Sequence, residues 1–289
     1  MSRYGKWETI RELGSGGQGV VYLVFNDDAL HEPVASGLTF AITGMAKPWR
    51  PEEISRLAIT LSEQLAKLNH FPPPYFGALK LLHGMVESAD VDKARERIIR
   101  EVEALRRVRH PNLLWILDAN LEGFQWFVGE YHERGPLSNH PDLFLGDTLR
   151  SLKAFRSIVD GVAKLHQAGI VHRDIKPANV FLATDGRLVL GDMGLVSFVD
   201  EELTRVTETY ENVGSRDWMP GWAYGMRLDK VQPSFDVFSL GKLLWSMISG
   251  KPILRLWYWN DPDYDLEKMF PGDPDAEPVN NFETLTVGI

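Results

Sequence analysis

The glycine-rich stretch from Gly14 to Gly19 lies between two segments with a β-strand pattern, and this placement restricts the fold more than any other feature. Residues 7–13 and 20–25 are rich in β-branched and aromatic side chains. In a dinucleotide-binding fold such glycines lead from a strand into a helix, whereas here a second strand follows. We therefore predict a hairpin whose tip carries Gly14, Gly16 and Gly19, where backbone N–H groups can approach phosphate oxygens because side chains are missing.

The first part of the chain has mostly strand patterns and the later part mostly helical ones, which indicates an α+β protein of two lobes. Further strands are expected near residues 77–82, 113–117 and 124–128. Helices are expected at about residues 92–108, 149–168 and 235–248. Gly169 and Gly250 follow the second and third of these helices and predict where each one ends.

Composition excludes several classes of protein. The 289 residues are 44% hydrophobic and 25% charged, which is typical of a folded globular chain. The formal net charge of −9 argues against nucleic-acid or anionic-membrane partners, and no apolar run is long enough to span a membrane. The chain has no cysteine, so thiolate metal sites, disulfides and cysteine nucleophiles are excluded. Without an apolar signal segment at the start, we expect a cytoplasmic protein.

Residues 26–76 form a distinct segment within the β-rich part. Apolar side chains from Ile54 to Leu68 recur at helical spacing, and three prolines at residues 72–74 then require an extended chain. The segment is either an insertion packed on its own lobe or a docking surface for a partner. We favour the first interpretation because apolar helix faces usually form core.

The segment from His172 to Asn179, with the sequence HRDIKPAN, is followed by Asp192-Met193-Gly194. These motifs resemble those of the eukaryotic-type (Hanks-type) Ser/Thr protein kinase family. The resemblance covers about residues 7 to 250 in the order that the family shows. It implies a bilobal protein-kinase-like fold. A β-rich N-lobe with one main helix would span residues 1–131, including the 26–76 insertion, and a mainly helical C-lobe, short at its C-terminal end, would span 132–289.

The resemblance also implies roles for the residues of these motifs. Asp174 matches the residue that orients the acceptor hydroxyl and takes its proton, and Lys176 matches the lysine that contacts the transferring phosphate in Ser/Thr-specific members. Asn179 and Asp192 match the metal ligands. Their hard oxygen atoms suit Mg²⁺, with Mn²⁺ as an alternative. The implied activity is transfer of the γ-phosphate of ATP to a serine or threonine hydroxyl of a protein substrate.

Lys80 and Glu101 match the family's phosphate-anchoring ion pair. Lys47 is a competing candidate, but only Lys80 stands in the Ala-x-Lys strand pattern that the family has, directly before the charged helix. Counting back ten residues from Pro111 reaches Glu101. An ion pair between Lys80 and Glu101 would hold the lysine ammonium against the α and β phosphates.

The resemblance places the adenine of ATP between apolar side chains of the two lobes. Val21 and Ala78 would form the roof of this site, and Phe181 its floor. Glu130 and His132, at the passage between the lobes, would offer backbone groups to the adenine ring.

Two positions on the C-terminal side bear on whether the chain is catalytic. Asp236 matches the family's central-helix aspartate, which anchors the backbone of the catalytic loop. Trp222 stands where the family has the glutamate of a buried ion pair, and the chain after Asp236 is short. A pseudokinase that binds nucleotide and acts as a scaffold or allosteric regulator is therefore the alternative. A small-molecule kinase of related fold ranks last, because its members usually lack the Lys176-Pro177 pair.

Overall fold

The computed structural model describes residues 2–16, 19–26, 76–81, 89–122, 126–192, 197–198, 216–218, 220, 232–252 and 262–273. The chain divides into two compact units, of which unit 1 comprises residues 1–102 and 115–133 and unit 2 residues 103–114 and 134–289. The limits predicted above for the two lobes stay a prediction. Nearly all of the 26–76 insertion lies outside the described residues, so neither interpretation of it is tested.

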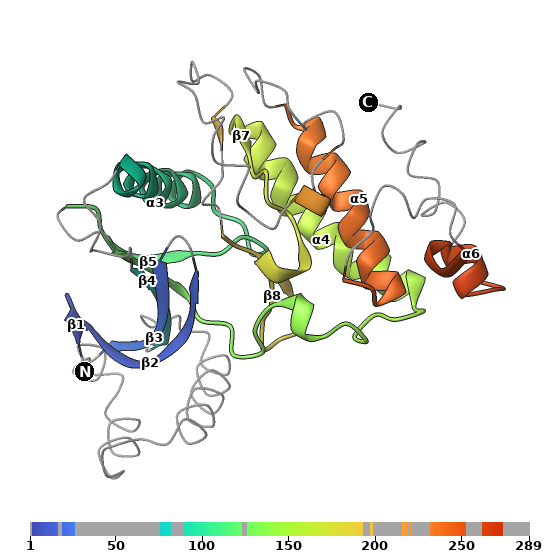
Figure 1. The fold of residues 1–289 in the computed structure, drawn as a ribbon, viewed down its shortest axis with the longest axis horizontal. Coiled ribbons are helices and arrows are strands. Elements are labelled where there is room, and N and C mark those ends of the chain that lie inside the picture. The colour runs from blue at the N-terminus through green and yellow to red at the C-terminus, as the bar shows by residue number, and fades with distance from the viewer. Residues whose placement is uncertain are drawn as a thin grey trace, which may run out of the picture. The chain divides into compact units, whose positions relative to one another are not determined.

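Unit 1 is built on an antiparallel sheet with the strand order β1-β2-β3-β4-β6-β5 (Figure 1). Its strands are β1 (Arg3–Tyr4), β2 (Trp7–Gly16), β3 (Gly19–Asn26), β4 (Phe76–Leu81), β5 (Ile116–Asn120) and β6 (Trp126–Glu130). The predicted glycine hairpin is confirmed, because β2 pairs with β3 and Gly16 lies opposite Gly19. Gly19 has a φ of +150°, which side chains of L-residues rarely adopt, so a glycine is required there.

The two faces of this sheet carry different apolar clusters. One face holds a cluster of large apolar side chains from five positions: Trp7, Val24, Leu79, Trp126 and Val128. On the other face, Phe127 of β6 packs against Ile98 and Val102 of the helix α3 (Ala89–Arg107). The helix predicted at about 92–108 is confirmed, and its packing fixes which sheet face lies next to α3.

Unit 2 is built around the helices α4 (Thr148–Gln167) and α5 (Ser234–Ser249), which lie side by side (Figure 1). Leu244, Trp245 and Ile248 of α5 form a buried cluster with Leu266 of the short helix α6 (Leu266–Met269). Both long helices are predicted from the sequence to within a residue or two. Gly250 ends α5 with a φ of +67°, the left-handed conformation that glycine adopts readily at this position.

Short elements complete the described part of unit 2. The strands are β7 (Ile170–Val171), β8 (Val180–Leu182), β9 (Leu188–Leu190) and β10 (Ser197–Phe198), where β8 pairs with β9 and β7 with β10. One-turn 3₁₀ helices are η3 (Leu137–Asn139), η4 (Pro177–Asn179), η5 (Arg216–Trp218) and η8 (Pro262–Tyr264). No helix among the described residues is long and apolar enough to span a membrane.

The strands predicted near 113–117 and 124–128 are displaced from the observed ones. Leu113 forms only an isolated bridge to Leu190 in unit 2, and β5 begins at Ile116. The strand β6 begins at Trp126 and extends to Glu130. Leu113 is buried because it packs within unit 2, so its apolar character does not mark a place in the sheet of unit 1.

Candidate active site

The carboxylate of Asp174 lies at the centre of a set of short contacts in the loop between β7 and η4. The ammonium of Lys176 lies 3.0 Å from Oδ1 and 2.8 Å from Oδ2 of Asp174. The amide Nδ2 of Asn179 donates to the main-chain oxygen and to Oδ2 of the same aspartate, both at 2.8 Å. The structure thus brings together three residues that the sequence assigns to catalysis and metal binding. Their contacts fix the direction of the Asp174 carboxylate.

Asp236 of α5 anchors the backbone of this loop. Its Oδ2 accepts a hydrogen bond from the main-chain N–H of His172, and its Oδ1 accepts one from that of Arg173, each at 2.8 Å. The Nε2 of His166 lies 2.8 Å from the same Oδ2. Asp236 is fully buried, so these three partners satisfy a carboxylate that water does not reach.

The imidazole of His172 links this loop to the residue before Asp192. The N–H of Asp174 donates to Nδ1 of His172 at 3.2 Å, so Nδ1 is the acceptor nitrogen and Nε2 carries the proton. Nε2 then donates to the main-chain oxygen of Gly191 at 3.1 Å. His172 therefore fixes the separation between the loop that carries Asp174 and the start of the Asp192 segment.

Asn179 and Asp192 form a donor set that fits a hard cation. The N–H of Gly191 donates to the main-chain oxygen of Asn179 at 2.9 Å. Asp192 is the next residue after Gly191, so this hydrogen bond holds the backbone of Asp192 near Asn179. Because Nδ2 of Asn179 is directed to Asp174, Oδ1 is the amide atom suited to a metal. Asp192 has a φ of +54°, uncommon for a residue with a side chain. Among the described residues, no group of three or more His, Asp or Glu side chains forms a ready-made cation site, so these two residues would need oxygen atoms of a phosphate or water to complete a shell.

Lys80 and Glu101 form an ion pair within unit 1. The Nζ of Lys80 in β4 lies 2.8 Å from Oε2 of Glu101 in α3. The side chain of Glu101 is 2% exposed and that of Lys80 is 14% exposed, so the lysine is the partner with access to a ligand. Lys80 also lies 5.8 Å from the ring centroid of Phe127, on the face against which α3 packs. The competing Lys47 lies outside the described residues.

Val21, Ala78 and Lys80 share one face of the unit 1 sheet. Val21 lies opposite Lys80 and Leu23 opposite Ala78 across β3 and β4, and directly opposed residues of an antiparallel pair project to the same side. This face is the one away from the cluster of Val24 and Leu79. A Cβ added to Gly14 would meet no atom of the described residues within 4 Å, so open space lies over that glycine.

The residues predicted to hold the adenine edge lie at the end of β6. The main-chain N–H of Glu130 donates to the main-chain oxygen of Trp115 at 3.1 Å, so this N–H is already engaged within unit 1. The side chain of His132 lies 4.0 Å from the Glu130 carboxylate. Tyr131 lies between these two residues in the chain. Burial raises the pKa of its hydroxyl, and the nearby positive charge of Arg11 partly opposes this rise. Tyr131 therefore keeps a neutral hydroxyl beside this segment.

Phe181, the predicted floor of the adenine site, belongs to β8 of unit 2. It pairs with Val189 and bridges to Pro136, and its ring lies 3.0 Å from where a Cβ on Gly191 would be. The candidate residues therefore fall into two sets, one in each unit. How the two sets face each other stays a prediction.

A comparison with protein families agrees with this geometry. Residues 77–267 match the model of the protein kinase domain. This chain belongs to the protein kinase family. The α+β kinase fold inferred from the motifs is thereby confirmed. The matched range begins at Gly77, so the assignment of the kinase glycine loop at Gly14, Gly16 and Gly19 rests on the residues and their hairpin alone.

Several known kinases resemble this chain over a little more than half its length. The probable serine/threonine-protein kinase PkwA of Thermomonospora curvata is 35% identical over 177 residues, which cover 57% of this chain and 22% of PkwA. The serine/threonine-protein kinase PAK 4 of Mus musculus is 30% identical over 181 residues, or 61% of this chain and 28% of PAK 4. The serine/threonine-protein kinase SMU1 of Mycosarcoma maydis is 30% identical over 159 residues, which cover 55% of this chain and 21% of SMU1. The matched part of this kinase chain is therefore a minor part of each relative.

The motifs did not identify every residue that shapes the kinase site. His166 of α4 contacts Asp236, and the signal that could have found it is a polar residue on the apolar face of this helix. Ser239 and Lys242 of α5 both donate to main-chain oxygen atoms of η5. Trp222 and most of the segment before it lie outside the described residues, so the structure does not bear on that departure from the kinase pattern.

Proposed function

We propose that this chain is an ATP-dependent serine/threonine protein kinase, which transfers the γ-phosphate of ATP to a hydroxyl group of a protein substrate. The observation that carries the proposal is the set of contacts of Asp174 with Lys176 and Asn179, in a loop that Asp236 anchors. The relatives reported above are named serine/threonine kinases, which favours an active enzyme over the pseudokinase alternative.

Asp174 is the proposed base. The hydroxyl oxygen of the substrate forms a bond to the γ-phosphorus, the bond from that phosphorus to the leaving ADP oxygen breaks, and the hydroxyl proton passes to the Asp174 carboxylate. The two contacts from Lys176 and the one from Asn179 hold the carboxylate in a single orientation toward the incoming hydroxyl. Lys176 also places a positive charge beside the reacting group, where negative charge is spread over the phosphoryl oxygens.

Lys80 is the proposed anchor for the α and β phosphates, held by Glu101 through their ion pair. Asn179 and Asp192 are the proposed ligands of Mg²⁺, with Mn²⁺ as an alternative, because their oxygen atoms are hard donors. The metal, when bound, neutralises part of the phosphate charge. Val21, Ala78 and Phe181 are proposed to contact the adenine, with backbone groups of Glu130 and His132 at its edge.

Transfer of radiolabelled phosphate from ATP to a generic protein acceptor such as casein tests this proposal. Wild type is expected to label the acceptor on serine and threonine. Asp174→Asn should lower the rate by at least about 100-fold, because removing a general base typically costs that much. Lys80→Met should lower it to a similar degree through loss of nucleotide positioning.

Matched controls make the outcome decisive. Asp142→Asn and Lys153→Met change the same residue types at exposed positions in unit 2 and should transfer at the wild-type rate. Far-UV circular dichroism checks that each variant is folded. Equal labelling by wild type, Asp174→Asn and Lys80→Met would reject the catalytic assignment, whereas nucleotide binding by wild type without any transfer would favour the pseudokinase.

A further inference from the structure

Lys242 is a lysine buried in the helix α5. It is 5% exposed, and the residues that follow it, Leu243, Leu244 and Trp245, are buried apolar ones. Burial lowers the pKa of Lys242 from 10.5 to about 8, and the negative charge of Asp217 partly opposes this shift. A cation in such surroundings costs free energy unless a specific partner accepts its hydrogen bonds.

That partner is the main chain of η5. The Nζ of Lys242 donates to the main-chain oxygen of Asp217, and the ammonium lies 5.1 Å from the ring centroid of Phe238, one turn earlier on α5. Ser239, three residues before Lys242 and thus on the same helix face, donates from Oγ to the main-chain oxygen of Trp218 at 2.9 Å. Two neighbouring carbonyl groups of a three-residue turn are therefore held by two side chains of one helix.

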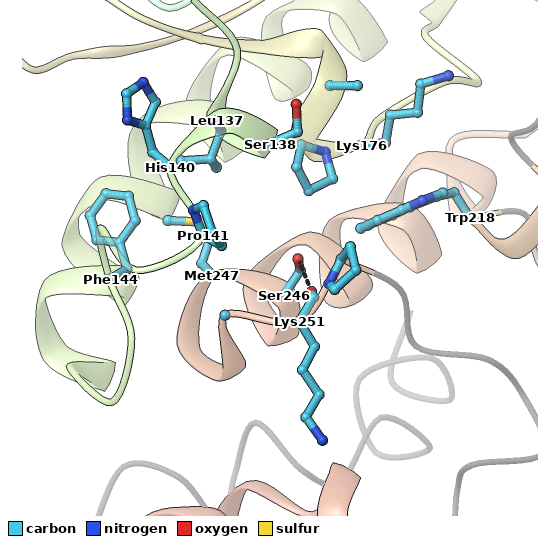
Figure 2. A pocket seen from close by; sticks show the side chains of 14 residues that line it. Leu137, Ser138, His140, Pro141, Phe144, Lys176, Trp218, Ser246, Met247 and Lys251 are labelled. Atoms are coloured by element: carbon cyan, nitrogen blue, oxygen red, sulfur yellow. Dashed lines mark hydrogen bonds between the residues drawn. The ribbon is translucent and has the colours of Figure 1, made fainter. Parts of the chain in front are cut away.

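The turn carries Trp218, whose side chain forms part of the wall of a cavity beside the catalytic loop. The cavity has a volume of about 300 Å³, and the other walls come from η3 and the segment after it, from the end of α5 and from the residues 176–178 that follow Asp174. Figure 2 shows the Trp218 ring and the Lys176 side chain on the same side of this cavity. Lys176, like Asn179, contacts the Asp174 carboxylate, so Trp218 lines the same cavity as a neighbour of the proposed base.

We propose that Lys242, together with Ser239, is a positioning residue for the protein substrate, because it fixes η5 and so places Trp218 in the wall of the cavity that Lys176 also lines. This inference rests on the proposed kinase function for the role of the cavity, although the anchoring of η5 is independent of that function. A hydrogen bond from an ammonium to a carbonyl in a water-poor site is stronger than one between neutral groups, so a lysine holds this turn more firmly than a neutral donor would. An apolar residue at position 242 would suit the helix core but would leave the Asp217 carbonyl without this donor.

Amide hydrogen exchange tests the anchor without any need for catalysis. In Lys242→Met, exchange in the peptide that contains residues 216–218 should become roughly tenfold faster or more, since a hydrogen bond to a charged group contributes at least that factor. Exchange in α4 should stay at the wild-type rate. Lys242→Arg, which keeps a charged donor, should restore most of the protection, and Ser239→Ala should show a smaller loss. Lys153→Met, an exposed lysine on α4, serves as the matched control and should change nothing.

Kinetics test the consequence for the substrate. In Lys242→Met the KM for the protein acceptor should rise by about tenfold, while the KM for ATP stays at the wild-type value, because Trp218 and not the nucleotide contacts are displaced. Lys242→Arg should recover most of the acceptor KM. If Lys242→Met does not fold, the same comparison is made between wild type, Lys242→Arg and Ser239→Ala, with Ser239→Ala expected to raise exchange at 216–218 and the acceptor KM together.

The possible results separate the two proposals. Unchanged exchange at residues 216–218, or faster exchange of equal size throughout α4 and α5, would overturn the anchoring role of Lys242. Faster exchange at 216–218 with an unchanged acceptor KM would overturn the link to substrate positioning. Absence of transfer by the wild type would count against the kinase function alone, since the exchange measurements would still decide whether Lys242 holds η5.

Discussion

The carboxylate of Asp236 holds the backbone of Arg173 in a left-handed conformation. Its Oδ1 accepts a hydrogen bond from the Arg173 N–H at 2.8 Å, and Arg173 has a φ of +70°. A residue with a side chain pays about 1–3 kcal/mol for such a conformation, so the surroundings must hold it in place. The bond to Arg173 and the parallel one to His172 supply that restraint one residue before Asp174.

Asp236→Asn tests this restraint. The amide can present its oxygen to only one of the two N–H groups and must turn its own NH₂ group toward the other, inside a fully buried site. We expect a loss of about 2–4 kcal/mol in the free energy of unfolding, from one lost charge-assisted hydrogen bond and one unsatisfied donor. Urea unfolding measures the change, with the exposed Asp142→Asn as control. A midpoint equal to that of wild type would show that the loop keeps its conformation without Asp236.

The ion pair of Lys80 and Glu101 should respond unequally to the loss of each partner. Glu101 is 2% exposed and Lys80 is 14% exposed, so Lys80→Met leaves the more deeply buried charge behind. Removing one partner of a buried pair costs about 3–5 kcal/mol, and we expect Lys80→Met to approach this range while Glu101→Gln costs less. Thermal or urea unfolding of both variants measures the order. The double variant Lys80→Met/Glu101→Gln should be more stable than Lys80→Met alone, and the reverse order would contradict the prediction.

Gly77 is a position in β4 that has no room for a side chain. A Cβ at this residue would lie 2.2 Å from Cγ1 of Val128 and 3.4 Å from the Trp7 ring, and both neighbours are buried. Gly77→Ala should therefore lower the free energy of unfolding by about 1–3 kcal/mol, as overpacked cores do. Gly14→Ala is the matched control, because its Cβ would meet no described atom within 4 Å, and it should shift stability by less than about 0.5 kcal/mol. Equal effects of the two substitutions would contradict this packing.

The titration of Lys242 predicts a pH dependence of stability. Its pKa is lowered to about 8 in the folded chain from 10.5. Between these values the unfolded chain binds a proton that the folded chain does not, so the free energy of unfolding rises with pH by up to about 3 kcal/mol. Among the described residues, Asp217 of η5 is the charged group acting on Lys242, while the adjacent α4 presents His166 to Asp236.

The difference in unfolding free energy between wild type and Lys242→Met isolates this contribution, because other titrating groups are common to both proteins. The difference should shift in favour of wild type from pH 8 to pH 10. Over the same interval, protection of residues 216–218 in wild type should weaken as the ammonium loses its charge. A difference that does not vary with pH would mean that Lys242 titrates at its ordinary value.

The sequence predicted those parts of the fold that repeat a regular pattern. The helices α4 and α5 were located closely because their apolar residues recur at helical spacing and each is followed by a glycine. The glycine hairpin was predicted because two strand patterns flank it. The limits of β5 could not be predicted, because Leu113 is apolar as a buried residue of unit 2, and a pattern of side chains does not reveal in which unit a residue is buried.

The residues of the candidate site also divide into those that the sequence predicted and those that only the structure revealed. Asp174, Asn179 and Lys176 stand close together in the chain, and the motif that they form is recognisable from the amino-acid sequence alone. Lys242 and His166 act on segments far away in the sequence, and a polar residue on an apolar helix face is the local sign of each. Their roles follow only from three-dimensional contacts, since a single lysine in an apolar helix indicates an unusual position without naming the group that it binds.

The anchoring of the catalytic loop by Asp236 also has a consequence for synthesis of the protein. The hydrogen bonds that Asp236 accepts from Arg173 and His172 join residues 63 and 64 positions apart, so the loop leaves the ribosome well before the helix that restrains it. Until translation has passed the start of α5, the nascent chain has the residues of the loop but not the Asp236 carboxylate that accepts the hydrogen bond from Arg173. We therefore expect the residues around Arg173 to reach their native backbone conformation only after α5 has been synthesised.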